Sequence, residues 1–388
     1  MLKQDIIREA TRLTRTGRLV EATALLQHML RGERTTNPTS HTDAIALLQP
    51  SIVDVKANWV KTQVPGTTAP EAGKARSNRT DDYSGFRLRG TTKRAPPSTR
   101  DIVPEGTRFI NGSYSNPAGS RTYRLFIPSG YHGQPLPLIV MLHGCTQSPE
   151  DFAAGTRMNF VAEAQPCFVV YPAQRREANP AKCWNWFRTI DQQRDTGEPS
   201  LIAGITQQIL REYSVDPKRV YVAGLSAGAA AAVVMGATYR DLYAAVGVHS
   251  GLACGAAVDL PSALLAMRHG GRFDQEAILT HPPTVPTIVF HGDHDGTVHP
   301  SNGDQVIKQS INATSTERKV HRGQVPGGRA YTRTVHSDAS GRHVFEHWSI
   351  HGAGHAWSGG SSAGSYTDPR GPDATREMLR FFLEHSLP

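Results

Sequence analysis

The chain has 388 residues, of which 38% are hydrophobic and 20% are charged, and its mean hydropathy is −0.40. This is the composition of a globular protein, and no run approaches the roughly 18 consecutive apolar residues that a membrane-spanning helix needs. The net charge of +8 falls wholly within the first hundred residues, which hold 17 Lys and Arg against 9 Asp and Glu. Residues 101–388 carry no net charge, which argues against a nucleic-acid-binding protein.

The N-terminal quarter divides into two segments. Residues 1–31 carry two apolar stripes around Gly17 and predict a helical hairpin. Residues 32–106 are rich in Thr, Pro, Ser, Gly and Arg, which predicts a basic, largely disordered linker. The excess charge of residues 1–100 suggests association with an anionic surface, and the alternative is a solvated tail. The chain begins without an apolar leader, so the cytoplasm is the default expectation.

From residue 107 onward, short apolar runs bounded by Gly and Pro alternate with helical patterns. Strands alternating with helices indicate an α/β domain over 107–388, with a mostly parallel sheet covered on both faces. The pattern before residue 136 indicates an antiparallel hairpin that leads into the sheet. The predicted strands are 123–127, 136–142, 167–171, 220–223, 244–248, 287–290 and 344–350, and the predicted helices lie near 149–165, 199–213, 226–238, 302–312 and 373–385.

The strongest chemical signal is the sequence VYVAGLSAG at 220–228, which places Gly-x-Ser-x-Gly between a predicted strand and an alanine-rich helix. This is the setting of the nucleophile elbow of α/β-hydrolases. The two glycines allow a tight turn, and the helix N-terminus lends partial positive charge where an oxyanion forms. We therefore predict that Ser226 is a nucleophile, and the alternative is a glycine-rich helix start.

A serine nucleophile needs a histidine base that a carboxylate orients. The predicted strand at 287–290 leads into HGDHDGTV at 291–298, where Asp295 is the preferred acid and Asp293 is the alternative. An aspartate here also commonly caps its own turn. The His and Asp residues of this segment suggest a metal site as a further alternative. Adjacent residues of one turn point in different directions, however, and no second set of ligands completes a shell.

The base and the oxyanion hole are predicted from the flanking loops. His355, in the glycine-flanked sequence HGAGHAW at 351–357, is the preferred base, and His351 is its competitor. One oxyanion donor is expected from the Ala227 amide, directly after the nucleophile. The other is expected from the Cys145 amide, in the loop HGCTQ after the strand at 136–142. Hydrolysis by these groups needs no cofactor and no metal.

Five motifs in order resemble the polyhydroxybutyrate depolymerase family of esterases, of the short-chain polyhydroxyalkanoate type, which is related to feruloyl and acetylxylan esterases. They are LHGCTQ at 142–147, CWNWF at 183–187, VAGLSAG at 222–228, HGDHDGTV at 291–298 and GAGHAWSGG at 352–360. The resemblance covers about 107–386 and implies an α/β-hydrolase fold. It also implies a Ser226–Asp295–His355 triad, with the Cys145 and Ala227 amides as oxyanion donors.

The activity implied by the resemblance is that of a serine esterase acting on short-chain hydroxyalkanoate polyester or its oligomers. A feruloyl or acetyl-type carbohydrate esterase is the alternative, with the same triad and a different acyl pocket. The expected partner is thus an ester polymer or oligomer, with no nucleic acid and no membrane span. The basic N-terminal extension lies outside the resemblance, and association with a polymer granule through residues 1–100 is a further expectation.

Aromatic residues and cysteines accompany these motifs. Trp184, Trp186 and Trp357 are predicted to wall an acyl groove, and the alternative is ordinary core packing. In the absence of a leader, free thiols are the default for the cysteines. Because Cys145 and Cys183 lie in two of the motifs, they are candidates for a disulfide near the site; the remaining cysteines are Cys167 and Cys254.

Overall fold

The computed structural model describes residues 97–271, 285–311 and 316–388. By its internal contacts the chain divides into Met1–Arg87 and Leu88–Pro388, and the described residues all belong to the second unit. The predicted hairpin over 1–31 and the predicted linker up to residue 96 lie outside the described residues.

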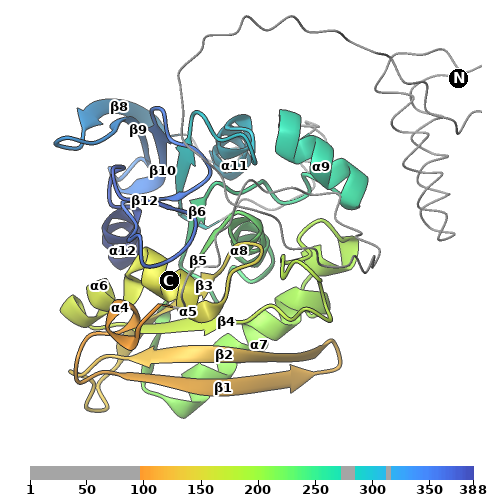
Figure 1. Ribbon diagram of the computed structural model, residues 1–388, viewed down its shortest axis with the longest axis vertical. Helices are drawn as coiled ribbons and strands as arrows, with labels where there is room; N and C mark the ends of the chain where they lie inside the picture. Colours follow the sequence, from red (N-terminus) through yellow and green to blue (C-terminus); the bar gives the residue numbers. More distant parts are fainter. Residues whose placement is uncertain (1–96, 272–284, 312–315) are drawn as a thin grey trace, which may run out of the picture. The chain divides into compact units, whose positions relative to one another are not determined.

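Ten strands of the described residues form one sheet, in the order β1-β2-β4-β3-β5-β6-β7-β10-β9-β8 (Figure 1). The six central strands, from β4 to β10, pair in parallel, whereas β1 and β2 at one end and β9 and β8 at the other pair antiparallel. This confirms the mostly parallel sheet and its antiparallel entry hairpin. The strands are β1 (Arg108–Asn116), β2 (Gly119–Ile127), β3 (Leu136–Leu142), β4 (Phe168–Pro172), β5 (Val215–Leu225), β6 (Ala245–His249), β7 (Thr287–Gly292), β8 (Glu317–Gln324), β9 (Ala330–Ser337) and β10 (His343–Ile350).

Helices cover both faces of the sheet, as Figure 1 shows. Helices α7, α8 and α11 pack on one face, while α5, α6 and α12 pack on the other. A small second sheet pairs β11 (Trp357–Ser358) with β12 (Thr367–Asp368). The helices are α4 (Thr99–Ile102), α5 (Pro149–Thr156), α6 (Met158–Ala164), the 3-10 helix η1 (Thr189–Gln192), α7 (Gly197–Glu212), α8 (Ala227–Thr238), α9 (Leu260–His269), α11 (Ser301–Ile311) and α12 (Ala374–Leu383).

The central strands read as continuous apolar runs because they are buried on both faces. Every residue of β3 is buried. Leu138 and Val140 belong to the core on the α8 side of the sheet, whereas Ile139 and Met141 belong to the core on the α12 side. Each such side chain contributes about 1.5–3 kcal/mol through burial. Two cores therefore hold the central strands, at whose carboxyl ends the predicted site residues lie.

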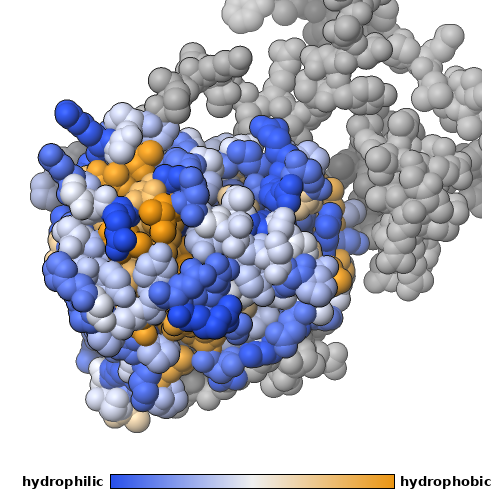
Figure 2. Space-filling model, turned by 90° about the horizontal axis from the view of Figure 1, so that it is seen from below, coloured by the Kyte–Doolittle hydropathy of each residue, from blue (hydrophilic) through white to orange (hydrophobic). Residues whose placement is uncertain are grey.

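The face seen from below in Figure 2 is mostly hydrophilic and carries a limited apolar area. Strand β8, with the sequence ERKVHRGQ, lies at the sheet edge and is exposed at all but one of its positions. It shows no alternation of apolar and polar residues, so periodicity could not indicate it.

Two predicted boundaries are wrong. The linker does not extend to residue 106, because Ile102 of α4 is buried and its carbonyl accepts a hydrogen bond from Asn159 Nδ2 at 2.9 Å. The single helix predicted near 149–165 is broken at Arg157, whose φ of 56° is left-handed and ends α5 before α6 begins. Helix α9 and strand β9 were not predicted.

Candidate active site

The predicted nucleophile lies on the sharp turn between β5 and α8. Ser226 has φ 58° and ψ −121°, a region that residues other than glycine rarely adopt. A Cβ atom on Gly224 would lie 2.3 Å from the carbonyl carbon of Gly228, and one on Gly228 would lie 2.1 Å from the Leu142 carbonyl oxygen. Only glycine fits at these two positions. The close approach of three backbone segments thus requires the Gly-x-Ser-x-Gly sequence.

The predicted acid lies in the turn that follows β7. Asp295 Oδ1 accepts hydrogen bonds from the backbone amides of Thr297 and Val298, each at 2.9 Å. Asp295 Oδ2 lies 2.7 Å from Nδ1 of His355. Both carboxylate oxygens therefore have partners, and one of them is aimed at the predicted base.

Burial and hydrogen bonding act on this carboxylate in opposite directions. The Asp295 side chain is 0% exposed, and burial by itself raises its pKa. The hydrogen bond with His355 and the Val298 amide more than offset burial and lower the pKa of Asp295 to about 2. The acid is therefore ionised at neutral pH. It accepts the Nδ1 proton of His355 and leaves Nε2 of that ring to take a proton from a hydroxyl.

The two alternatives, Asp293 and His351, form a second carboxylate–imidazole pair. Asp293 Oδ2 lies 2.9 Å from His351 Nδ1, and Nε2 of the same ring lies 2.9 Å from the Thr332 hydroxyl. These two side chains are 34% and 45% exposed, against 0% and 12% for Asp295 and His355. Because both ring nitrogens of His351 already have partners, the geometry favours the buried pair as acid and base.

His249, the last residue of β6, links the nucleophile to the loop of the base. Its backbone carbonyl accepts the Ser226 amide at 2.9 Å, and its ring Nε2 accepts the Ser358 amide, also at 2.9 Å. The ring stacks on Trp357, two residues after His355, with ring centroids 5.2 Å apart. The Ser226 hydroxyl and the His355 ring are not hydrogen-bonded to each other. Such bonds are often long before substrate binds and then shorten.

Sequence reasoning missed His249. Burial lowers the pKa of His249 to about 3, so the ring is neutral and Nε2 can act as an acceptor. Its Nδ1 lies 3.2 Å from the Ser250 hydroxyl, which accepts the remaining ring proton. A single histidine at a strand end carries no distinctive pattern, so the sequence held no signal for this role.

The two predicted oxyanion donors lie on adjoining backbone segments. The first turn of α8 packs directly against the end of β3, since a Cβ on Gly228 would meet the Leu142 carbonyl. The amides that flank Cys145 are engaged: Gly144 N donates to Gln147 Oε1 at 2.9 Å, and Thr146 N donates to a carbonyl at 2.7 Å. Neither the Cys145 amide nor the Ala227 amide donates to another described residue. Both are left available to a substrate oxygen.

The loop that carries Cys145 is held by a disulfide. Cys145 and Cys183 are joined, with an S–S distance of 2.02 Å, whereas Cys167 and Cys254 are free and buried. The default expectation of free thiols is therefore wrong for the first two and correct for the others. Trp184, next to Cys183, donates from its indole nitrogen to the His143 carbonyl at 3.1 Å. The CWNWF motif thus contacts the loop at 143–147, which we call the oxyanion loop.

The structure places two of the three predicted groove tryptophans in the interior. Trp184 is 0% exposed and Trp357 is 1% exposed, and the Trp357 indole donates to the Thr375 hydroxyl at 2.9 Å. Both rings pack in the core, which is the alternative to the predicted groove walls. Trp186, at 6% exposure, lies nearer the surface but is also largely buried. The sequence alone does not tell whether a tryptophan of a motif packs in the core or lines a pocket.

The histidines and aspartates of the turn at 291–298 point in different directions. His291 Nε2 donates to the Val298 carbonyl at 2.9 Å and lies 3.5 Å from Asp295 Oδ2, so His291 supports the acid from the interior. No group of three or more His, Cys, Asp or Glu side chains in the described part of the chain is arranged to hold a metal ion. No helix of that part is long and apolar enough to cross a membrane.

Comparisons with known proteins identify relatives among esterases. The model of the Esterase PHB depolymerase family matches residues 121–318. Poly(3-hydroxyalkanoate) depolymerase C of Paucimonas lemoignei is 32% identical over 250 residues, which are 62% of this chain and 59% of that protein. Feruloyl esterase B of Neurospora crassa is 29% identical over 241 residues, 58% of this chain and 80% of that protein.

A solved structure agrees on the fold. The acetyl xylan esterase from Aspergillus awamori superposes with a TM-score of 0.56 at 18% identity, covering 71% of this chain and 99% of that one. The similarity extends over almost the whole esterase, whereas the match to the Paucimonas protein spans less than two thirds of its length. The family model covers more than half of the chain and includes Ser226 and the predicted acid, Asp295. The chain therefore belongs to the Esterase PHB depolymerase family.

Proposed function

We propose that the protein is a serine esterase that hydrolyses short-chain hydroxyalkanoate polyester or its oligomers. The observation that carries the proposal is the buried Asp295–His355 pair, 2.7 Å between Oδ2 and Nδ1, linked through His249 to the Ser226 elbow. This is the order and the division of roles of a serine hydrolase triad.

The first half of the reaction forms an acyl-enzyme. Ser226 Oγ attacks the ester carbonyl carbon while His355 Nε2 takes the hydroxyl proton, and Asp295 stabilises the resulting imidazolium. The carbonyl oxygen becomes an oxyanion that accepts hydrogen bonds from the Cys145 and Ala227 amides. The imidazolium then donates its proton to the leaving alkoxide, and an alcohol departs.

The second half releases the acid. Water attacks the acyl-enzyme as His355 takes one of its protons, and the same two amides stabilise the second tetrahedral intermediate. Collapse of that intermediate breaks the bond to Ser226 Oγ, which regains its proton from His355. The expected test is hydrolysis of p-nitrophenyl butyrate by the purified protein and its loss in Ser226→Ala with the fold intact. Full activity in that variant would refute the assignment.

The polyester substrate is supported by the Paucimonas relative, which carries depolymerase in its name. Release of 3-hydroxybutyrate from amorphous poly(3-hydroxybutyrate), compared with release from its oligomers, tests this choice. Hydrolysis of neither would leave the esterase chemistry in place and remove the polyester from the proposal.

A carbohydrate-linked ester is the second candidate. It is favoured by the extent of the sequence matches, which reach 80% of the feruloyl esterase but 59% of the depolymerase. Release of ferulate or acetate from xylan-derived esters, measured beside release of 3-hydroxybutyrate, distinguishes the two. The larger kcat/KM identifies the substrate class.

Granule or anionic-surface association is a further proposal, motivated by the +8 charge carried by the first hundred residues. Sedimentation with polymer granules should retain the full chain better than a chain that begins at Pro97. Salt at 0.5 M, where the Debye length is only about 4 Å, should remove the difference. Equal sedimentation of both chains would end this idea.

The compartment also stays a prediction. A disulfide beside the active site favours an oxidising compartment, because cytosolic thiols are kept reduced, whereas the sequence default was the cytoplasm. Trapping of free thiols in freshly lysed cells, followed by a count of the alkylated cysteines, decides between the two.

A further inference from the structure

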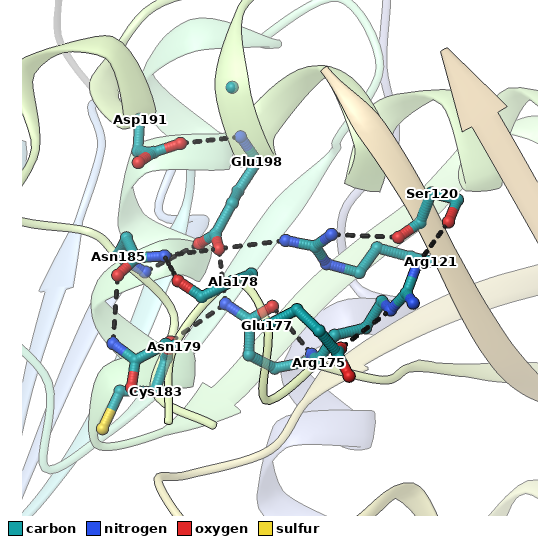
Figure 3. Close-up of polar contacts among 12 residues, drawn as sticks. Ser120, Arg121, Arg175, Glu177, Ala178, Asn179, Cys183, Asn185, Asp191 and Glu198 are labelled. Carbon is teal, nitrogen blue, oxygen red and sulfur yellow. Dashed lines mark hydrogen bonds and ion pairs between the residues drawn. The ribbon is translucent and has the colours of Figure 1, made fainter. Parts of the chain in front are cut away.

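A buried polar cluster lies behind the loop that carries Cys145. It consists of Arg121 on β2, Gln174 after β4, Asn185 in the CWNWF motif and Glu198 in the first turn of α7, and we call it the Glu198 cluster. Figure 3 shows Arg121 and Asn185 reaching the Glu198 carboxylate from different elements. None of these side chains belongs to the triad or to the oxyanion hole.

Glu198 is the centre of this cluster. Its Oε2 accepts the Asn185 backbone amide at 2.7 Å, and its Oε1 accepts Asn185 Nδ2 at 2.8 Å and Arg121 Nη2 at 3.2 Å. Gln174 Nε2 donates to Oε1 as well. One carboxylate therefore joins three separate segments of the chain. The Arg121 and Glu198 side chains are only 6% and 8% exposed.

A buried ion pair is weak support for stability, because removing both charges from water is costly. Replacement by apolar side chains of similar volume is often neutral or stabilising in other proteins. The cluster even leaves one buried atom, Arg121 Nε, without a partner in the described part of the chain. Because burying these charges contributes little to the free energy of folding, the cluster is better explained by the backbone segments that it positions.

Three contacts carry the cluster to the oxyanion loop. The Gln174 backbone amide donates to Nε2 of His143 at 3.0 Å, and Nδ1 of the same ring donates to the Gly144 carbonyl at 2.8 Å. Gln174 Nε2 also donates to the Cys183 carbonyl at 2.9 Å. Cys183 is bonded to Cys145 through the disulfide. The cluster thus holds both sides of the Cys145 amide, through His143 and through Cys183.

We propose that Glu198 is a positioning residue for the reaction: by fixing Gln174 and Asn185 it holds the Cys145 amide where the oxyanion forms. The inference rests on the proposed esterase function, since it assigns Cys145 its role there. Glu198 touches no reacting atom and acts only through its neighbours. A displacement of a donor by about 1 Å is enough to cost much of its effect, because preorganised donors act over hydrogen-bond distances.

The test compares Glu198→Gln with a matched control, Glu346→Gln. Glu346 on β10 is also a buried carboxylate, 0% exposed, held by Arg333 and Arg380 at 2.8 Å, but it has no contact with the oxyanion loop. Both variants lose one buried charge of a Glu–Arg pair. General destabilisation should therefore affect both, whereas displacement of the loop should affect only Glu198→Gln.

Kinetics on p-nitrophenyl butyrate and inhibition by butylboronic acid give the first readout. The boronate forms a tetrahedral adduct with a serine and reports oxyanion stabilisation. We expect Glu198→Gln to lower kcat at least about tenfold with KM within about twofold, and to weaken boronate inhibition by a similar factor. Glu346→Gln should leave both unchanged. Unchanged kcat and boronate affinity in folded Glu198→Gln, or equal losses in both variants, would overturn the proposal.

A second readout does not depend on activity. The rate at which dithiothreitol reduces the Cys145–Cys183 bond in the native protein reports the mobility of the same loop. We expect reduction several-fold faster in Glu198→Gln and unchanged in Glu346→Gln, and equal rates would count against the proposal. A wild-type protein without esterase activity would sink the proposed function and with it the oxyanion role of Cys145, while these rates would still decide whether Glu198 fixes the loop that carries Cys145. If Glu198→Gln does not fold, Gln174→Met takes its place, because it removes the side-chain hydrogen bonds from Gln174 to Glu198 and to the Cys183 carbonyl.

Discussion

The backbone amide of Ser358 donates a hydrogen bond to Nε2 of His249 at 2.9 Å, across 109 residues of sequence. The same histidine accepts the Ser226 amide through its carbonyl, so one residue at the end of β6 holds both the nucleophile and the loop of the base. The ring also stacks on Phe290 of β7, with centroids 5.9 Å apart. The separation between serine and base is therefore set by the rigid sheet.

Replacing His249 by Phe keeps a flat ring for stacking and removes the acceptor for Ser358. A buried amide left without a partner costs about 1–3 kcal/mol, and we expect a loss of unfolding free energy of that size. We also expect kcat to fall at least about tenfold as the base loop shifts. His385→Phe is the control, because His385 is equally buried but binds the Phe381 and His343 carbonyls, away from the site. Equal kinetics of the two variants would contradict the role of His249.

The strained backbone at Ser226 separates activity from stability. Its φ of 58° costs a non-glycine residue about 1–3 kcal/mol, and glycine adopts this angle freely. Ser226→Gly and Ser226→Ala should both lack esterase activity. Thermal unfolding should show Ser226→Gly to be more stable than Ser226→Ala by about 1 kcal/mol. Higher stability of the alanine variant would show that the turn is not strained.

Asp295 should make stability depend on pH in the acid range. Burial opposes ionisation and the hydrogen bonds favour it, and the net result is a folded-state pKa of about 2, below the unfolded value near 3.9. The ionised carboxylate therefore stabilises the fold above about pH 4 by roughly 2 kcal/mol, and this is lost as pH falls from about 4 to 2. Urea unfolding of wild type and Asp295→Asn should differ most at pH 5 and converge toward pH 2. A constant difference would contradict the low pKa.

The exposed pair offers the matching negative control for the triad. Asp293→Asn and His351→Gln remove partners of a pair that is 34% and 45% exposed, and exposed pairs contribute about 0–1 kcal/mol. We expect kcat within about twofold of wild type for both. Asp295→Asn, by contrast, should lose at least about a thousandfold, because the base loses its orientation. A large loss in Asp293→Asn alone would reverse the assignment of the acid.

The disulfide should support both stability and rate. It closes a loop with a sequence separation of 38, for which chain entropy gives about 3–4 kcal/mol. We expect the double change Cys145→Ser and Cys183→Ser to lower the unfolding free energy by up to that amount and to reduce kcat. Cys167→Ala, at a free cysteine on the far side of the sheet, should lower stability without changing kcat. Full activity of the double variant would show that the oxyanion loop needs no cross-link.

Local signals allowed much of the site to be predicted. The elbow is contiguous, so the residues that force the turn, Gly224 and Gly228, stand beside the serine in the sequence. The central strands were predictable because burial on both faces leaves continuous apolar runs, as in β3. Strand β8 was not, because an exposed edge strand has no such pattern. The break between α5 and α6 depends on one residue, Arg157, in the left-handed conformation, and the periodicity of apolar residues does not indicate such a break.

The sequence by itself determined the α/β architecture, and it predicted the nucleophile and the order in which acid and base follow it, because each depends on neighbours along the chain. Only the tertiary structure favours Asp295 over Asp293, since the two lie in one turn and differ in burial and in the histidine that each one meets. It also placed Trp184 and Trp357 in the core and showed the hydrogen bonds on which the roles proposed for His249 and Glu198 rest. The hydrogen bonds of these two residues join segments that are distant in sequence, and only folding brings such segments together.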